Sequence, residues 1–218
     1  MVAMRGWSRR VRFACAAIVA ACALAAPGAR AEVLDAAEQA RLAQGQSIVR
    51  EQTYENDERR FVGGLTYTVI EATPEELFTL FDDVAAWRNV LPKTKSARAV
   101  GTQGADTFVE LSQGNALITA SYTLRLRKSA RDRTVRFWLD PERPHAIDDA
   151  WGFFRADPMP AAEDGTPRSL LTFGVLVDMG PGLARALYEE RMRAAMLGVP
   201  QLVRQYVART VRRKAVPT

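Results

Sequence analysis

The sequence predicts an α+β fold in which a curved antiparallel sheet wraps around one long C-terminal helix. Apolar residues recur at helical spacing over residues 182–213, which predicts an amphipathic helix of about 30 residues and about 45 Å. The segments before it alternate apolar and polar residues with period two, as strands do. Short connections between these segments favour antiparallel neighbours. The apolar face of the sheet and the apolar stripe of the helix can then cover each other.

Residues 1–31 are predicted to be a signal peptide that lies outside the folded domain. An arginine-rich start is followed by an uncharged apolar run over residues 13–26 and by Ala29-Arg30-Ala31, a small-x-small cleavage site. We therefore expect cleavage after Ala31 and a periplasmic or secreted protein. An alternative is a lipoprotein anchored at Cys22, because Val19-Ala20-Ala21-Cys22 resembles a lipoprotein signal.

The charge of the chain changes when the signal peptide is set aside. Five of the 30 basic residues lie in residues 1–31, which leaves 25 basic residues against 25 acidic ones. The positive excess therefore belongs to the signal peptide, and we expect no nucleic-acid partner. Basic residues remain clustered at 209–214, where they suit a helix C-terminus. This cluster leaves open a transient contact with a membrane surface.

The rest of the chain is expected to form one domain without disulfides, because both cysteines lie in the signal peptide. Residues 32–45 are predicted to be a short helical extension that ends at Gly45. The main domain is expected over residues 46–213, and residues 214–218 form a tail.

Two short helices are predicted between the early strands. Thr73 can cap a helix, Pro74 suits its first position, and Glu76 completes a capping box. Asp83 is expected to cap a second helix that carries Trp87. The strand candidates around these helices are residues 46–52, 65–72, 94–100, 107–113, 116–127, 134–140, 149–155 and 169–179.

Four stretches of sequence carry a further signal: TPEELFTLFDDVAAWRNVLP (73–92), GFFRADP (152–158), SLLTFGVLVDMGPG (169–182) and VPQLVR (199–204). Together with the order of these elements, they resemble the START-like superfamily, also called SRPBCC or helix-grip. The similarity is greatest to its polyketide cyclase/dehydrase and lipid transport branch, near the coenzyme-Q-binding START domains. The resemblance implies about seven strands curled around the C-terminal helix, with an apolar cavity between sheet and helix.

The candidate ligand-binding residues are the bulky apolar side chains expected on the inner side of the strands and on the helix stripe. Methionine and tyrosine on the helix give an adaptable lining with a polar group. The alternative interpretation is that these residues simply fill a core. Pro200 is expected to bend the helix. The candidates are Trp87, Tyr122, Phe137, Phe154, Phe173, Tyr188, Met192 and Met196.

The residues that carry most enzyme chemistry are scarce. His145 is the single histidine and lies in a proline-rich turn, so neither a Ser-His-Asp triad nor a zinc site is expected. The strand carboxylates Glu71 and Glu110 are predicted to face water, and Asp178 to set a turn. We therefore assign no catalytic residue, no metal and no cofactor.

The sequence favours an exported binding protein for an apolar small molecule, such as a lipid, an isoprenoid quinone or a polyketide-like ring. One alternative is a cyclase- or dehydratase-like enzyme that uses the same cavity, with Tyr122 or Tyr188 as proton donor. The other is a non-catalytic envelope interaction protein whose interior is filled.

Overall fold

The computed structural model describes residues 34–55, 59–115 and 119–215. The elements form one compact unit, Asp35–Thr218, and the predicted signal peptide lies outside the described residues. The helices are α1 (Ala36–Ala43), α2 (Pro74–Leu80), α3 (Trp87–Val90), α4 (Leu183–Leu197) and α5 (Val199–Ala215), with a 3-10 turn η1 (Val84–Ala86) before α3. The strands are β1 (Ile48–Glu55), β2 (Arg60–Ile70), β3 (Thr94–Gln103), β4 (Asp106–Gly114), β5 (Thr119–Ser129), β6 (Thr134–Leu139), β7 (Asp149–Met159) and β8 (Arg168–Asp178).

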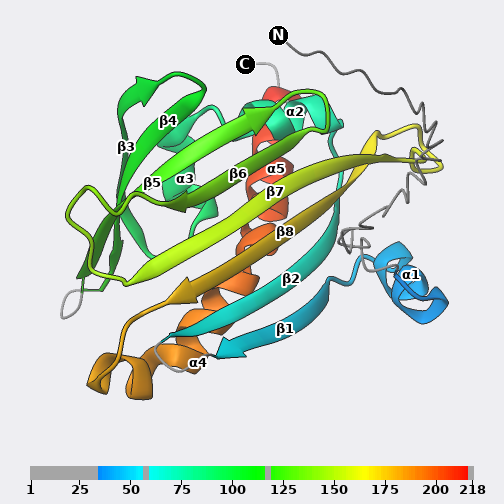
Figure 1. Ribbon diagram of the computed structural model, residues 1–218. Coiled ribbons are helices and arrows are strands. Elements are labelled where there is room, and N and C mark those ends of the chain that lie inside the picture. The colour runs from blue at the N-terminus through cyan, green and yellow to red at the C-terminus, as the bar shows by residue number, and fades with distance from the viewer. Residues whose placement is uncertain (1–33, 56–58, 116–118, 216–218) are drawn as a thin grey trace, which may run out of the picture. The chain divides into compact units, whose positions relative to one another are not determined.

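The strands form one curved antiparallel sheet in the order β1-β2-β8-β7-β6-β5-β4-β3, and α4 and α5 pack on β2 and β8 (Figure 1). The sheet therefore has eight strands, and the seven implied by the family resemblance are wrong. The period-two segments of the sequence already number eight, because β1 contributes a full edge strand beside β2. The α+β class and the sheet wrapped around a C-terminal helix are confirmed.

Strand register defines two faces of the sheet. Phe154 pairs with Phe173, and Phe173 pairs with Thr66, so the three side chains lie on the same side. The Thr66 hydroxyl donates a hydrogen bond to the carbonyl of Leu197 at the end of α4. This side, which we call the inner face, therefore meets the C-terminal helices. The outer face carries the residues between them, such as Trp151 and Leu176.

The C-terminal helix is two helices, and the single helix predicted over residues 182–213 is wrong. The helix is interrupted at Gly198. The Gly198 amide donates a hydrogen bond to the Ala194 carbonyl (3.1 Å) at the end of α4, and the Gln201 amide donates to the Gly198 carbonyl (3.1 Å) at the start of α5. Pro200 has no amide hydrogen to continue the α4 ladder, which explains a break at this position. Thr66 replaces the missing partner of Leu197 by donating its hydroxyl to that carbonyl at 2.9 Å.

Replacing Thr66 with valine is expected to destabilise the protein by about 1–3 kcal/mol, because the buried Leu197 carbonyl loses its hydrogen bond at nearly constant volume. Urea unfolding measures this change. Thr172→Val is the matched control, since the Thr172 hydroxyl is equally buried in a strand and has no partner among the described residues. The control should be neutral or stabilising, and equal losses in both variants would contradict the assigned bond.

Helices α1 and α2 both begin with a capping box. The predicted capping box of α2 is confirmed: the Glu76 amide donates to Thr73 Oγ1 (3.1 Å) and the Thr73 amide to Glu76 Oε2 (2.8 Å). Helix α1 has a second capping box between Asp35 and Glu38. Glu38 also accepts hydrogen bonds from Arg50 on β1, and this guanidinium holds the pKa of Glu38 below its usual range. One carboxylate therefore both caps α1 and ties it to the sheet.

Candidate functional site

An aromatic cluster occupies the centre of the inner face. Phe154 stacks on Phe173 with ring centroids 4.7 Å apart and on Phe81 at 4.3 Å. Phe137 lies against Phe154 and Phe173 at 5.6 and 6.2 Å. Three of the predicted ligand-binding residues, Phe137, Phe154 and Phe173, are therefore brought together. Their rings are buried and contact one another, so this part of the interior is packed.

Trp87 is the most informative of the predicted residues. It begins α3, only 3% of it is exposed, and it belongs to the same hydrophobic cluster. Its indole nitrogen Nε1 has no hydrogen-bond partner among the described residues. An indole N–H is a donor only, and leaving such a donor unpaired in the interior costs about 1–3 kcal/mol. Trp87 therefore places one unused donor inside an apolar environment.

Tyr122 lies at the margin of this cluster on the inner face of β5. Its hydroxyl donates to Gln113 Oε1, and the Gln113 amide donates in turn to the Pro92 carbonyl and to Thr94 Oγ1, both at 3.0 Å. Burial raises the pKa of Tyr122 above its ordinary value. The hydroxyl is therefore held as a neutral phenol against an amide, which cannot accept its proton as a carboxylate base would.

The carboxylates considered from the sequence lie elsewhere. Glu71 is exposed, and Glu110 pairs with Arg98 at 2.9 Å on the outer face. Asp178 is buried and accepts the Gly180 amide at 2.9 Å, so it sets the corner before α4. No group of three or more histidine, cysteine or acidic side chains with metal-binding geometry occurs among the described residues.

The helix residues of the predicted set divide into two groups. Met192 and Met196 are partly exposed and pack against the larger hydrophobic cluster that contains the aromatic rings. Tyr188 is also partly exposed but lies outside that cluster. The structure thus brings seven of the eight predicted residues to one cluster and leaves Tyr188 apart.

Helix α4 also contacts the sheet through charged side chains. Glu189 accepts three hydrogen bonds from the guanidinium of Arg60 on β2, the shortest being 2.9 Å. Arg193 pairs with Glu189 and with Glu51 of β1. The side chains of Glu189 and Arg193 are both nearly buried. Their opposite charges are matched across the contact between α4 and the sheet.

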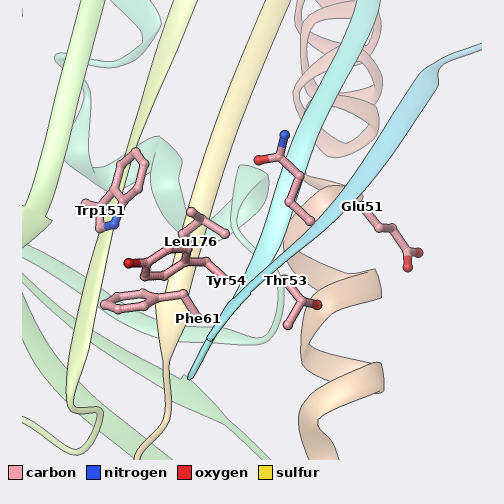
Figure 2. Close-up of a pocket in the computed structure, with 7 residues that line it drawn as sticks. Glu51, Thr53, Tyr54, Phe61, Trp151 and Leu176 are labelled. Atoms are coloured by element: carbon pink, nitrogen blue, oxygen red, sulfur yellow. The ribbon is translucent and has the colours of Figure 1, made fainter. Parts of the chain in front are cut away.

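A pocket that was not predicted from the sequence lies on the outer face. Its volume is about 630 Å³, and Figure 2 shows the rings of Tyr54 and Phe61 beside Leu176, with Trp151 on the next strand. The signal in the sequence was β7, where Trp151 and Phe153 alternate with Gly152 and Phe154. Bulky residues on both faces of one strand indicate that neither face is simply solvated.

Helices long and apolar enough to cross a membrane do not occur in the part of the chain that the structure describes. The amino-acid sequence matches no protein-family model and no curated protein.

Solved structures provide the comparison. The chain is similar to a STAR-related lipid transfer protein from Xanthomonas axonopodis, with 15% identity, a TM-score of 0.59, and coverage of 74% of this chain and 93% of that one. It is also similar to the Zhui aromatase/cyclase from Streptomyces sp. R1128, with 12% identity, a TM-score of 0.54, and coverage of 78% and 97%. A START superfamily protein from Mycobacterium smegmatis matches with 10% identity, a TM-score of 0.53, and coverage of 67% and 97%. The resemblance to the START-like superfamily predicted from the sequence is therefore confirmed at the level of the fold: this chain has the helix-grip fold of START-like proteins.

Proposed function

We propose that this protein binds an apolar small molecule between the inner face of the sheet and the helices that cover it, and that it does so outside the cytoplasm once residues 1–31 are removed. Support for export comes from the signal pattern of the sequence. Support for the ligand class comes from the fold, because similar structures include a lipid transfer protein and an aromatase/cyclase.

The observation that carries this proposal is the unpaired indole N–H of Trp87 in an otherwise apolar cluster. Buried donors in folded proteins are nearly always paired, and an unpaired one requires an explanation. A ligand that brings a carbonyl or ether oxygen to this nitrogen would supply it. The ligand is then an apolar molecule with at least one hydrogen-bond acceptor, such as a quinone, an ester lipid or a polyketide-like ring.

Adaptability of the site is supplied by the methionines. Met192 and Met196 pack on the cluster while remaining partly exposed, so they lie where the interior reaches the surface. Unbranched thioether side chains can change rotamer at little cost and fill irregular space. Burial of apolar ligand surface contributes about 25 cal/mol per Å², less the losses on association.

Trp87→Phe is expected to weaken the binding of a short-chain ubiquinone by about threefold to tenfold, because one hydrogen bond of about 0.5–1.5 kcal/mol is lost while the ring is kept. Delipidated protein titrated with this quinone, followed by native mass spectrometry, gives the affinity. A saturated hydrocarbon of similar size has no acceptor and should bind both forms equally.

Trp138→Phe serves as the matched control, because Trp138 lies on the outer face, where Arg127 stacks on its ring. Its affinity for the quinone should equal that of the original protein. If the protein takes up no quinone, no lipid and no fluorescent fatty acid, the proposed function is wrong. Equal effects of the two tryptophan substitutions would contradict the hydrogen bond from Trp87 but not the binding of an apolar ligand.

A further inference from the structure

Side chains on the outer face of four neighbouring strands form the outer-face pocket. Register places Gln52, Gly63, Leu176 and Trp151 in one row across β1, β2, β8 and β7. Gly63 has no side chain, so the row has a gap between Gln52 and Leu176. The next row begins with Tyr54, whose partner is Phe61. The gap and the aromatic side chains around it account for a hollow of about 630 Å³.

The walls of this pocket are aromatic side chains that the fold leaves in water. Tyr54 is 57% exposed and Trp151 is 49% exposed, while Phe61 is buried as the floor beside Tyr54 at a ring distance of 6.4 Å. Among the described residues, only two other large apolar side chains, Val49 and Leu187, are comparably exposed. Two half-exposed aromatic rings that line one hollow are therefore a local feature and not a general property of this surface.

Apart from Glu51, the polar side chains that line the pocket are neutral. Neither the Gln52 amide nor the Tyr54 hydroxyl makes a side-chain hydrogen bond within the described residues. The carboxylate of Glu51 points away from the aromatic rings in Figure 2 and pairs with Arg193 at 3.2 Å. The pocket thus offers aromatic faces, one amide and one phenol, without an uncompensated charge from its lining.

We infer that this pocket binds an uncharged saccharide, held by stacking on Tyr54 and Trp151 and by hydrogen bonds to Gln52. A pyranose ring has an apolar C–H face, whose weakly positive hydrogens suit the negative face of an aromatic ring. It also carries adjacent hydroxyls, which match the paired donor and acceptor of an amide. A purely apolar ligand would leave the Gln52 amide unpaired, and a charged ligand would find no free counter-charge in the lining.

The test follows the indole N–H signal of Trp151 by NMR while the protein is titrated with cellotetraose, maltotetraose and chitotetraose. The signal is assigned by its disappearance in Trp151→Phe. At least one tetrasaccharide should shift it in a saturable way, while the indole signal of Trp87 on the inner face stays in place. Calorimetry should show binding about fivefold to tenfold weaker for Trp151→Ala and for Tyr54→Ala.

Leu187→Ala is the matched control, because Leu187 is 62% exposed on α4 and does not line this pocket. It should leave saccharide binding unchanged, and thermal unfolding should show that all of these variants remain folded. Three outcomes would overturn the inference: no tetrasaccharide shifts the Trp151 signal, Leu187→Ala weakens binding as much as Trp151→Ala, or only dodecylphosphocholine micelles shift the signal. Quinone uptake should be unaffected by Trp151→Ala, so failure here is distinct from failure of the proposed inner ligand.

Discussion

Gly64→Ala is expected to destabilise the protein by about 3–5 kcal/mol, a large fraction of the stability of an ordinary domain. Gly64 lies in the middle of β2 with φ +143°, and an added Cβ would stand 2.0 Å from the carbonyl oxygen of Arg50 on β1. Neither group can move without separating the two strands, because both belong to the backbone. Urea unfolding of the variant, together with its soluble yield, measures the effect.

Gly101→Ala separates backbone strain from collision. Gly101 has a similar φ of +152°, but an added Cβ would meet nothing within 4 Å. It also lies at a register shift in the edge strand β3, where the backbone is free on one side. This control should lose only the cost of the unusual φ, about 1–2 kcal/mol. Equal losses at both positions would show that the close approach of β1 at Gly64 contributes nothing.

Phe154→Ala is expected to cost about 3–5 kcal/mol, because the ring is buried and contacts three other rings. These partners come from α2's C-terminal end, β6 and β8, so the cavity cannot collapse without moving several elements. Chemical denaturation measures the loss. If the site accepts apolar ligands, a small aromatic compound added to the variant should recover part of the stability.

Phe153→Ala is the neighbouring control on the same strand. The ring of Phe153 lies on the outer face over Gly174 and is only partly buried. Its removal should cost about 1 kcal/mol, close to the average for a substitution. A larger loss at Phe153 than at Phe154 would mean that the outer face, and not the aromatic cluster, holds the sheet together.

Much of the fold follows from local patterns. The Thr73 capping box predicts α2 because the required residues are only three positions apart. Period-two alternation likewise predicts the strands, although their ends shift by several residues, as for β2, which begins at Arg60 and not at residue 65. Pro200 predicts a bend in this region, but a full break at Gly198 could not be predicted because the apolar pattern continues on both sides of it. Thr66, the partner that the Leu197 carbonyl takes at this break, is far away in the sequence.

The two proposed binding surfaces differ in how far the sequence could reveal them. Phe137, Phe154 and Phe173 could be assigned to one face because alternation fixes which side of a strand a residue occupies. The ion pairs of Glu189 depend on which strand lies under α4, and helical periodicity does not contain this information. The outer pocket was missed for the same reason. Tyr54 lies on β1 and Trp151 on β7, and they line one pocket only because the sheet places β2 and β8 between these strands.

The hydrogen bond from Thr66 fixes the C-terminal helix at its middle and not at one of its ends. On one side of this point, α5 is held by buried side chains such as Val203. On the other side, α4 combines the apolar contacts of Met192, Met196 and Leu197 with the ion pairs of Glu189 and Arg193. The two halves therefore rest on forces with different responses to salt, since screening weakens charge pairs and strengthens apolar contacts little. Amide exchange in α4 can then quicken with ionic strength while α5 stays protected, which makes the C-terminus two cooperative units joined at a fixed point.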